Sequence, residues 1–539
     1  MRLSHRLLTP LAAVAAFALL AAACGEGDPV DVDDPAVEDP AEDPTDDPVD
    51  DPVDDPVDDP DEEPAPTAAG TLVAAIGGDP DQLDPHLTTS SFAFTVLENV
   101  YDTLVQPGDD LTMEPALAES WEVSEDLLTW TFSLRDGVSF HDGSPFTAED
   151  VVASLEFIAA EGANGWRLEA VDEYVAVDDL TVELVLNRPA PNLLEQIGPF
   201  KGMAIAPAAA IEAGTLGDEP IGTGPFSYVS FSPGDSVVLE AFDDYWGEGP
   251  FLDGIEFRVI PDEQVKLTNL ETGEVDWIDS VPPEQLTALE GRDDLVVGRV
   301  AGNDYWYLAL NHDRAPFDDL EVRRAIAFAL DPATIAEATN FDAATPNETA
   351  IPETSFWYLD YAPFGFDPDQ GQSLLDEAGV EDLTIDLMVT SEFPETVTAA
   401  QVIASQLEAI GIDVEIRTED FATWLADQGE GEFDAFMLGW LGNIDPDDFY
   451  YAQHHSTGGF NFHGYANAEV DELLDAARVE LDVDARKDLY DQAVQLIVDE
   501  VSYLYFYNPD ITEAWSPDVT GYVTRPDVAT RFNTTQFTG

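Results

Sequence analysis

Cysteine is nearly absent from this sequence: among 539 residues the only one is Cys24. A single cysteine excludes a disulfide framework, and it excludes zinc or iron–sulfur sites that need several thiolates. We therefore expect a chain that works without a structural metal and without a cofactor.

Basic residues are scarce as well, with 19 Lys+Arg against 112 Asp+Glu and a formal net charge of −93. Lysine occurs only as Lys201, Lys266 and Lys487. Such a surface repels a phosphate backbone, so nucleic acid is excluded as a partner. An acid-rich, lysine-poor surface is typical of proteins in high salt, because the Debye length falls to roughly 3 Å at 1 M and self-repulsion is screened.

Long hydrophobic runs are also missing after the first residues. Arg2 and Arg6 precede an apolar stretch, 11–23, which is shorter than the ~20 residues of a membrane span. It ends in Ala-Ala-Ala-Cys24-Gly, which resembles a bacterial lipobox, although the preferred leucine, Leu20, stands one place early. This predicts a lipoprotein signal peptide over 1–24 and diacylation of Cys24; the alternative is an ordinary secretory signal with an incidental cysteine.

Residues 25–69 lack any apolar face. Between Gly25 and Pro64 there are 20 acidic and no basic residues, and the unit Asp-Asp-Pro-Val recurs from Asp46 onward. Proline blocks helix formation and the charges repel one another, which predicts a disordered tether that holds the body off the membrane. Cation binding by this segment is the alternative interpretation.

Hydrophobic residues make up 45% of the whole sequence, and the part after residue 69 has the length for two or more domain-sized cores. Alternating apolar residues and helical spacing predict an α/β protein. Over 117–135 a short helix precedes a strand, and Thr147 begins a helix as its N-cap. The expected elements are a first strand at 72–76, a hairpin at 175–186, a strand–helix–strand unit over 385–416, a strand at 433–438, helices at 468–481 and 484–499, and a strand at 503–507.

Several phrases, in order over roughly 71–520, resemble the solute-binding proteins of ABC importers in the branch that binds peptides and, in some members, nickel or sugars. The phrases are Leu83-Asp-Pro-His86, Tyr101-Asp-Thr-Leu104, Pro115-Ala-Leu-Ala-Glu-Ser-Trp121, Leu134-Arg-Asp-Gly137, Phe140-His-Asp-Gly143, Gly222-Thr-Gly-Pro-Phe226, Asp244-Tyr-Trp246, Val322-Arg-Arg-Ala-Ile326, Leu374-Leu-Asp-Glu-Ala-Gly379 and Asn467-Ala-Glu-Val-Asp471. The glycines of Gly222-Thr-Gly224 would let the chain pass close to another segment.

The resemblance implies a bilobal fold, periplasmic-binding-protein-like of type II, that closes around a small ligand. It places lobe I at 70–305 plus 504–539, with an extra subdomain at about 112–190, and lobe II at 306–503. A hinge of two strands is expected near Val300–Tyr305 and Leu504–Asn508. The implied protein is a monomer, held by its lipid anchor on the outer, extracytoplasmic face of the membrane, which delivers a small peptide or peptide-like solute to an ABC permease.

Peptide-binding relatives capture the α-ammonium group of the peptide with an aspartate three residues after a Gly-Trp pair. Here the phrase is Gly439-Trp440-Leu-Gly-Asn443-Ile-Asp445-Pro, so Asn443 stands in that place and the charge-assisted hydrogen bond is missing. A register shift could bring Asp445 into the role. A solute with a neutral polar end becomes more plausible, and an oligosaccharide or another non-peptide solute stays open.

Aromatic residues supply candidate walls for the ligand: Trp440, the pair Tyr305-Trp306 near the hinge, and Trp357 in lobe II. For each ring, packing in the core is the competing interpretation. His454, His455 and His463 invite a metal or nickel-chelate hypothesis, but their spacing fits no closed tetrahedral set. We expect them in a polar loop.

Two other classes of protein compete with the transport binder. An enzyme, such as a glycosidase with two carboxylates, is disfavoured because 112 acids make any pairing uninformative. The sequence also contains no Gly-x-Ser-x-Gly, His-Glu-x-x-His or Walker-type phosphate loop. A surface sensor of the same fold without a permease is the remaining alternative.

Overall fold

The structure is a computed structural model that describes residues 70–538 except 109–110, 392 and 441–443. The predictions for the signal peptide, Cys24, the tether and Asn443 concern residues outside the described ranges.

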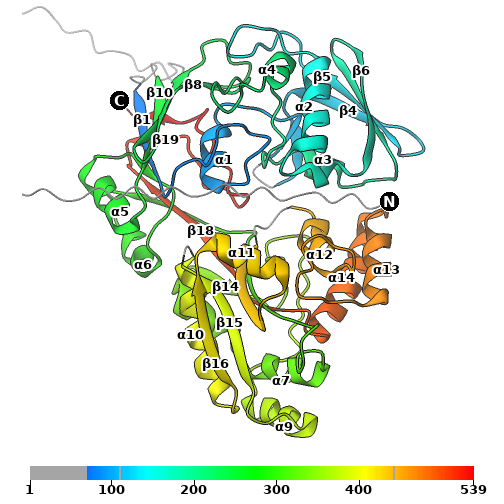
Figure 1. Cartoon of the computed structure of the whole chain (residues 1–539). Helices are drawn as coiled ribbons and strands as arrows, with labels where there is room; N and C mark the ends of the chain where they lie inside the picture. Colours follow the sequence, from blue (N-terminus) through cyan, green and yellow to red (C-terminus); the bar gives the residue numbers. More distant parts are fainter. Residues whose placement is uncertain (1–69, 109–110, 392, 441–443, 539) are drawn as a thin grey trace, which may run out of the picture. The chain divides into compact units, whose positions relative to one another are not determined.

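The chain alternates strands and helices, as expected of an α/β protein (Figure 1). The strands are β1 (Thr71–Ile76), β2 (Val105–Pro107), β3 (Met113–Pro115), β4 (Ala118–Val123), β5 (Thr129–Leu134), β6 (Val171–Asp178), β7 (Thr181–Leu186), β8 (Phe226–Ser232), β9 (Ser236–Ala241), β10 (Gly254–Val259), β11 (Trp277–Ile278), β12 (Val296–Ala301), β13 (Tyr305–Leu310), β14 (Ala344–Pro346), β15 (Thr384–Thr390), β16 (Asp413–Glu419), β17 (Ala435–Trp440), β18 (Tyr503–Trp515), β19 (Val519–Thr520) and β20 (Gln536–Phe537). The α-helices are α1 (Ser91–Leu97), α2 (Ala148–Glu161), α3 (Leu193–Ile197), α4 (Ala208–Ala213), α5 (Glu263–Thr272), α6 (Leu286–Leu289), α7 (Leu320–Ala329), α8 (Pro332–Asn340), α9 (Pro368–Ala378), α10 (Pro394–Glu408), α11 (Phe421–Glu430), α12 (Pro446–His454), α13 (Ala468–Ala477) and α14 (Val483–Asp499). Two short 3-10 helices are η1 (Gly165–Leu168) and η2 (Pro283–Gln285).

Two sheets share the long strand β18. In lobe I the strand order is β18-β11-β1-β10-β9-β8, and in lobe II it is β16-β15-β17-β13-β18. Residues 510–515 of β18 pair with β12, whereas 503–507 pair with β13 and 507–509 with β14. The strand therefore stays in the lobe II sheet through Pro509, beyond the boundary at 503 that the sequence suggested (Figure 1).

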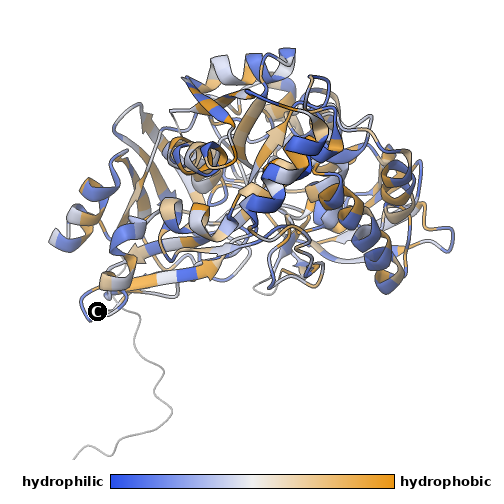
Figure 2. Cartoon of the chain, turned by 90° about the horizontal axis from the view of Figure 1, so that it is seen from below, coloured by the Kyte–Doolittle hydropathy of each residue, from blue (hydrophilic) through white to orange (hydrophobic). Residues whose placement is uncertain are grey.

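The strand–helix–strand unit of lobe II has the predicted form. Strands β15 and β16 pair in parallel, and α10 joins them, with Ile403 and Leu407 fully buried on its inner face. A parallel pair needs such a crossover, because a hairpin cannot return the chain in the same direction. Hydrophilic and hydrophobic residues are mixed along the helices and strands of the body (Figure 2).

A four-stranded antiparallel sheet, β4-β5-β7-β6, forms the extra subdomain together with α2. The hairpin of β6 and β7 was predicted correctly, and Thr147 is the N-cap of α2, where its backbone N–H donates to Asp150 at 2.9 Å. The short helix expected after Leu117 is wrong. Residues 118–123 form β4, because Trp121 pairs across the sheet with Phe132, and such pairing overrides a weak local preference.

The Gly222-Thr-Gly224 turn passes against the backbone of Val100, as predicted. A Cβ atom on Gly222 would lie 2.0 Å from the carbonyl oxygen of Val100, and one on Gly224 would lie 2.6 Å from its carbonyl carbon. No other residue type fits there. The turn also places the hydroxyl of Thr223 at 2.8 Å from the Asp102 carboxylate.

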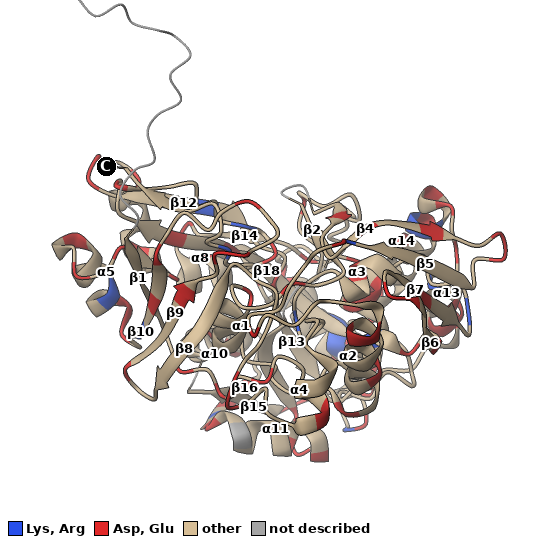
Figure 3. Ribbon diagram, turned by 90° about the horizontal axis from the view of Figure 1, so that it is seen from above, with Lys and Arg blue, Asp and Glu red and all other residues tan. Residues whose placement is uncertain are grey.

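Acidic residues are spread over the helices and strands of the body, with few lysines or arginines between them (Figure 3). Among the residues that the structure describes, no helix combines the length and the apolarity of a membrane span.

Candidate functional site

The Gly439–Trp440 pair ends strand β17 beside the first residues of β13. Trp306 lies opposite Gly439, and Tyr305 lies opposite Trp440. A Cβ atom on Gly439 would lie 2.8 Å from the ring of Trp306, so glycine is what lets the indole cross this strand. Trp440 is half-buried and meets Phe460 edge to face, with their ring centroids 4.9 Å apart.

Trp306 and Tyr305 have different surroundings although they are neighbours in sequence. Trp306 is half-buried, stacks on Tyr507 and meets Phe393 edge to face. Tyr305 has no exposed surface and packs against Phe449 and Tyr505. The expectation that Tyr305 contacts a ligand is corrected here: successive side chains of a strand point to opposite faces, and Tyr305 points into the core.

Asp445 is the N-cap of α12, and its carboxylate is fully engaged. Arg486 from α14 donates two hydrogen bonds to it, at 2.6 and 2.7 Å. The backbone N–H of Asp447 donates at 3.0 Å, and the side-chain amide of Asn192 donates at 3.1 Å. Since Asp445 and Arg486 are both buried, the carboxylate could receive a ligand's ammonium group only after this pair separated.

Trp357 joins the same group of residues through Arg486. The guanidinium of Arg486 lies over the Trp357 ring, 5.1 Å from its centroid, while its other side binds Asp445. Trp357 also meets Tyr490 edge to face. The structure thus brings Trp357 and Asp445 together through an arginine that the sequence analysis did not single out.

The subdomain of lobe I contacts lobe II through buried polar side chains, which we call the interlobe cluster. Gln196 from α3 donates to Asp448 of α12 at 2.9 Å, and Arg167 from η1 lies 3.7 Å from the same carboxylate. Asn192 reaches Asp445 as described above. The five side chains Arg167, Asn192, Gln196, Asp445 and Asp448 are each at most 6% exposed, so the contact excludes water and specifies one arrangement.

Burial makes several acids of this region hard to ionise. Desolvation raises the pKa of Asp447 to about 7, against the opposing effect of the Arg478 cation. It also raises the pKa of Glu195 to about 7, and the neighbouring charge of Asp445 adds to the effect. These groups titrate near neutral pH because water is kept from them.

The sequence analysis singled out Asp445 but none of the other four residues of the interlobe cluster. Arg486, which holds Asp445, stands in the first turns of a charged helix, where an arginine is normally solvated. Asn192 is the N-cap of the short helix α3, and Gln196 lies within it. The contacts of Asn192 and Gln196 with lobe II join residues about 250 positions apart.

The histidines do not form the polar loop that we expected. His454 and His463 are fully buried, and both ring systems hydrogen-bond the hydroxyl of Ser502 at 2.8 Å. The second ring nitrogen of His454 lies 2.7 Å from the hydroxyl of Tyr505. The polar loop is wrong because Ser502, just before β18, and Tyr505, within β18, supply internal hydrogen-bond partners for these rings. Across the described ranges, no three His, Cys, Asp or Glu side chains are placed to hold a metal ion.

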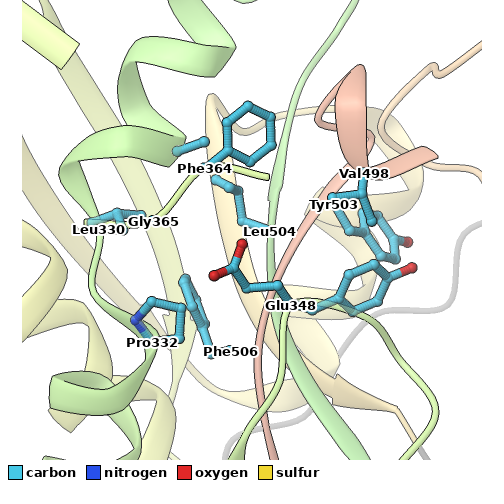
Figure 4. Close-up of a pocket in the computed structure, with 11 residues that line it drawn as sticks. Leu330, Pro332, Glu348, Phe364, Gly365, Val498, Tyr503, Leu504 and Phe506 are labelled. Carbon is cyan, nitrogen blue, oxygen red and sulfur yellow. The ribbon is translucent and has the colours of Figure 1, made fainter. Parts of the chain in front are cut away.

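A small pocket behind β18 in lobe II is lined mainly by apolar side chains (Figure 4). Its volume of about 20 Å³ is room for one water molecule and not for a solute. Leu330, Phe364 and Phe506 line it, and burial raises the pKa of Glu348 at its edge.

The family profile described as "Bacterial extracellular solute-binding proteins, family 5 Middle" matches residues 112–461. The Escherichia coli dipeptide-binding protein is 31% identical over 500 residues, covering 86% of this chain and 94% of that protein. The glutathione-binding protein GsiB of Pectobacterium atrosepticum is 29% identical over 487 residues, covering 87% and 95%. The structure of the periplasmic binding protein DppA from Helicobacter pylori, in complex with peptide STSA, has a TM-score of 0.78 and 28% identity, covering 87% and 98%. The fold is thus that of the bilobal periplasmic binding proteins, and the chain belongs to the family 5 extracellular solute-binding proteins, which serve ABC importers and are not enzymes.

Proposed function

We propose that this protein captures a small peptide or peptide-like solute between its lobes and passes it to the membrane permease of an ABC importer. The observation that carries the proposal is the similarity over 86% of the chain to a dipeptide-binding protein. The interlobe cluster supports it, because contacts between lobe I and α12, which follows the Gly439–Trp440 phrase, are what a closed binding protein needs.

In this proposal the half-buried rings of Trp440, Trp306 and Trp357 contribute the aromatic walls of the solute site. Asn443 offers a neutral amide in place of the aspartate of peptide-binding relatives. The solute therefore presents a blocked, amidated or otherwise uncharged polar end at this position, or an ammonium group that is held more weakly. Asp445 serves as a positioning residue for α12, since its carboxylate is held by Arg486.

Native mass spectrometry of the purified full chain is the first test, because a solute retained by the protein would appear as a defined mass increment. Calorimetry would then compare dipeptides with free and acetylated amino ends, glutathione, an oligosaccharide and chelated nickel. Trp440→Ala should weaken binding of the bound solute at least tenfold, which corresponds to about 1.4 kcal/mol. Binding of none of these ligands, or an unchanged affinity in Trp440→Ala, would contradict the proposed site.

We also propose that Cys24 is diacylated and that residues 25–69 act as an acidic tether between the membrane and the body. Metabolic labelling with a fatty acid should mark the wild type and not Cys24→Ser, and globomycin should retain the precursor. A mature chain that begins elsewhere than at Cys24 would contradict the anchor.

A further inference from the structure

Lobe I contains a large cavity that the proposed function does not use. Its volume is about 790 Å³, within the range of small-molecule sites. Its wall combines the chain that follows α1, the Tyr245-Trp246 pair and the C-terminal segment from Gly521 to Thr534. None of the residues of the interlobe cluster and none of the proposed solute-contacting tryptophans line it.

Two carboxylates of the wall, those of Glu98 and Asp102, each accept hydrogen bonds through only one of their two oxygens. Glu98 accepts the backbone N–H of Thr530 with Oε2 at 2.9 Å. Asp102 accepts the Thr223 hydroxyl and the Trp246 indole N–H with Oδ2, both at 2.8 Å. Within the described part of the chain, the other oxygen of each group has no hydrogen-bond partner.

Burial makes the anionic forms of Glu98 and Asp102 less stable. Burial raises the pKa of Glu98 to about 7, although the Arg531 cation opposes the shift. Burial also raises the pKa of Asp102, against its hydrogen bonds from Trp246 and Thr223. A cation placed between them would restore both charges, since an opposite charge within a few ångströms favours ionisation.

A weakly held arginine forms part of the same wall. Arg531 contacts Gln106 Oε1 and the carbonyl oxygen of Pro107, both at 3.4 Å, and it has no ion pair within the described ranges. Arg525, by contrast, is paired with Asp527 and donates to the carbonyl oxygens of Pro107 and Gly108. With Glu114 and Glu248 counted, the wall carries four carboxylates and one guanidinium that has no carboxylate partner among the described residues.

We propose that this cavity is a second small-molecule site and that it binds a basic α-amino acid. The α-carboxylate of the ligand pairs with Arg531, because a guanidinium offers a carboxylate two parallel hydrogen bonds. The ligand's cationic groups pair with the unpartnered oxygens of Glu98 and Asp102. Its aliphatic chain lies against Tyr245 and Trp246, and its net positive charge matches the acidic excess of the wall.

L-arginine is the probe that tests this site, measured by calorimetry on the full chain. L-citrulline has the same shape without the side-chain charge, and agmatine lacks the carboxylate; each should bind at least tenfold more weakly than L-arginine. Glu98→Gln keeps an oxygen that accepts from the N–H of Thr530, and it should weaken the binding of L-arginine at least tenfold. The matched control is Glu149→Gln, on the exposed face of α2, which should leave the affinity unchanged.

Arg531→Gln tests the contact with the α-carboxylate of the ligand. It is the deciding variant if Glu98→Gln does not fold. The variant should bind L-arginine only as tightly as the wild type binds agmatine. The proposal is overturned if L-arginine does not bind the wild type, or if both substitutions leave its affinity unchanged. It is equally overturned if Trp440→Ala abolishes L-arginine binding, because the ligand would then occupy the interlobe site; failure of the peptide proposal does not affect this result.

Discussion

At the scale of single residues, Asn443 is the position at which the proposed solute site is expected to differ from that of peptide-binding relatives. An aspartate there would restore a charge-assisted hydrogen bond to a peptide's ammonium group. We predict that Asn443→Asp raises affinity for a free-amine dipeptide by about tenfold, or about 1.4 kcal/mol, and does not raise it for the acetylated form. Calorimetry with both peptides measures this, and equal changes for the two would argue against a role for residue 443 at the amino end.

For Asp445 we predict an effect on stability, because its carboxylate caps α12 and pairs with Arg486. Breaking a buried, hydrogen-bonded ion pair by removing one partner costs about 3–5 kcal/mol. We predict that Asp445→Asn lowers the free energy of unfolding by that amount in urea titrations, since Arg486 is left buried and unpaired. Wild-type stability in this variant would show that the pair contributes little. Asp448→Asn, which keeps a group that can accept from Gln196, should cost less.

These two residues also show how far sequence reasoning reaches at this scale. The Gly-Trp phrase led to Trp440, which is half-buried like Trp306 and Trp357, and contact of these rings with a solute stays a prediction. Tyr305 alternates into the core, and Asp445, which a register shift was expected to bring toward the ligand, is held by Arg486, 41 positions away. Partners that distant leave no local signal in one sequence.

At the scale of elements, the chain at the start of β18 lies against two buried histidines, His454 at the end of α12 and His463. Burial lowers the pKa of His454 to about 3, and burial, with smaller effects from His454, His312 and Arg323, lowers that of His463 well below 6.5. The unfolded chain takes up these protons near pH 6.5 and the folded chain does not, so this contribution to stability falls as the pH drops below about 6.5. Asp447 and Glu195 act in the opposite direction, since the folded state takes up their protons first as the pH falls from about 7.

Replacing one histidine measures how much that residue contributes to the pH dependence of the free energy of unfolding. We predict that His463→Gln, which can still donate to Ser502, makes the fall in unfolding free energy between pH 6.5 and 4 shallower by about 1.4 kcal/mol per pH unit. Urea denaturation of both proteins at several pH values measures the slopes. Parallel slopes for wild type and variant would mean that His463 is already protonated in the folded state.

Elements were easier to predict than contacts. Strand alternation and helical spacing gave β1, β15, β16, α10 and α14 close to their observed bounds, because these periodic patterns are local in the sequence. The conformation of β4 was mispredicted because pairing with β5 decides it, and the histidines were misplaced because their shared partner, Ser502, lies 39 and 48 positions away.

At the scale of the whole molecule, charge sets the conditions under which the fold is stable. A net charge of −93 destabilises a compact state through self-repulsion, and salt screens it. We predict that the melting temperature rises by several degrees between about 0.1 and 2 M KCl. Calorimetric melting at matched pH measures this, and a melting temperature that is flat or falls with salt would contradict the interpretation of the acidity.

The central claim is that the two lobes close on a solute, with the interlobe cluster formed in the closed state. Fluorescence transfer tests it most directly, using dyes at Glu149→Cys in the subdomain and Glu469→Cys in lobe II, in a Cys24→Ser background. Both positions are exposed. Addition of the solute identified by mass spectrometry should raise the transfer efficiency in a saturable way, and less so with Trp440→Ala. A transfer efficiency that does not respond to a bound solute would contradict the account.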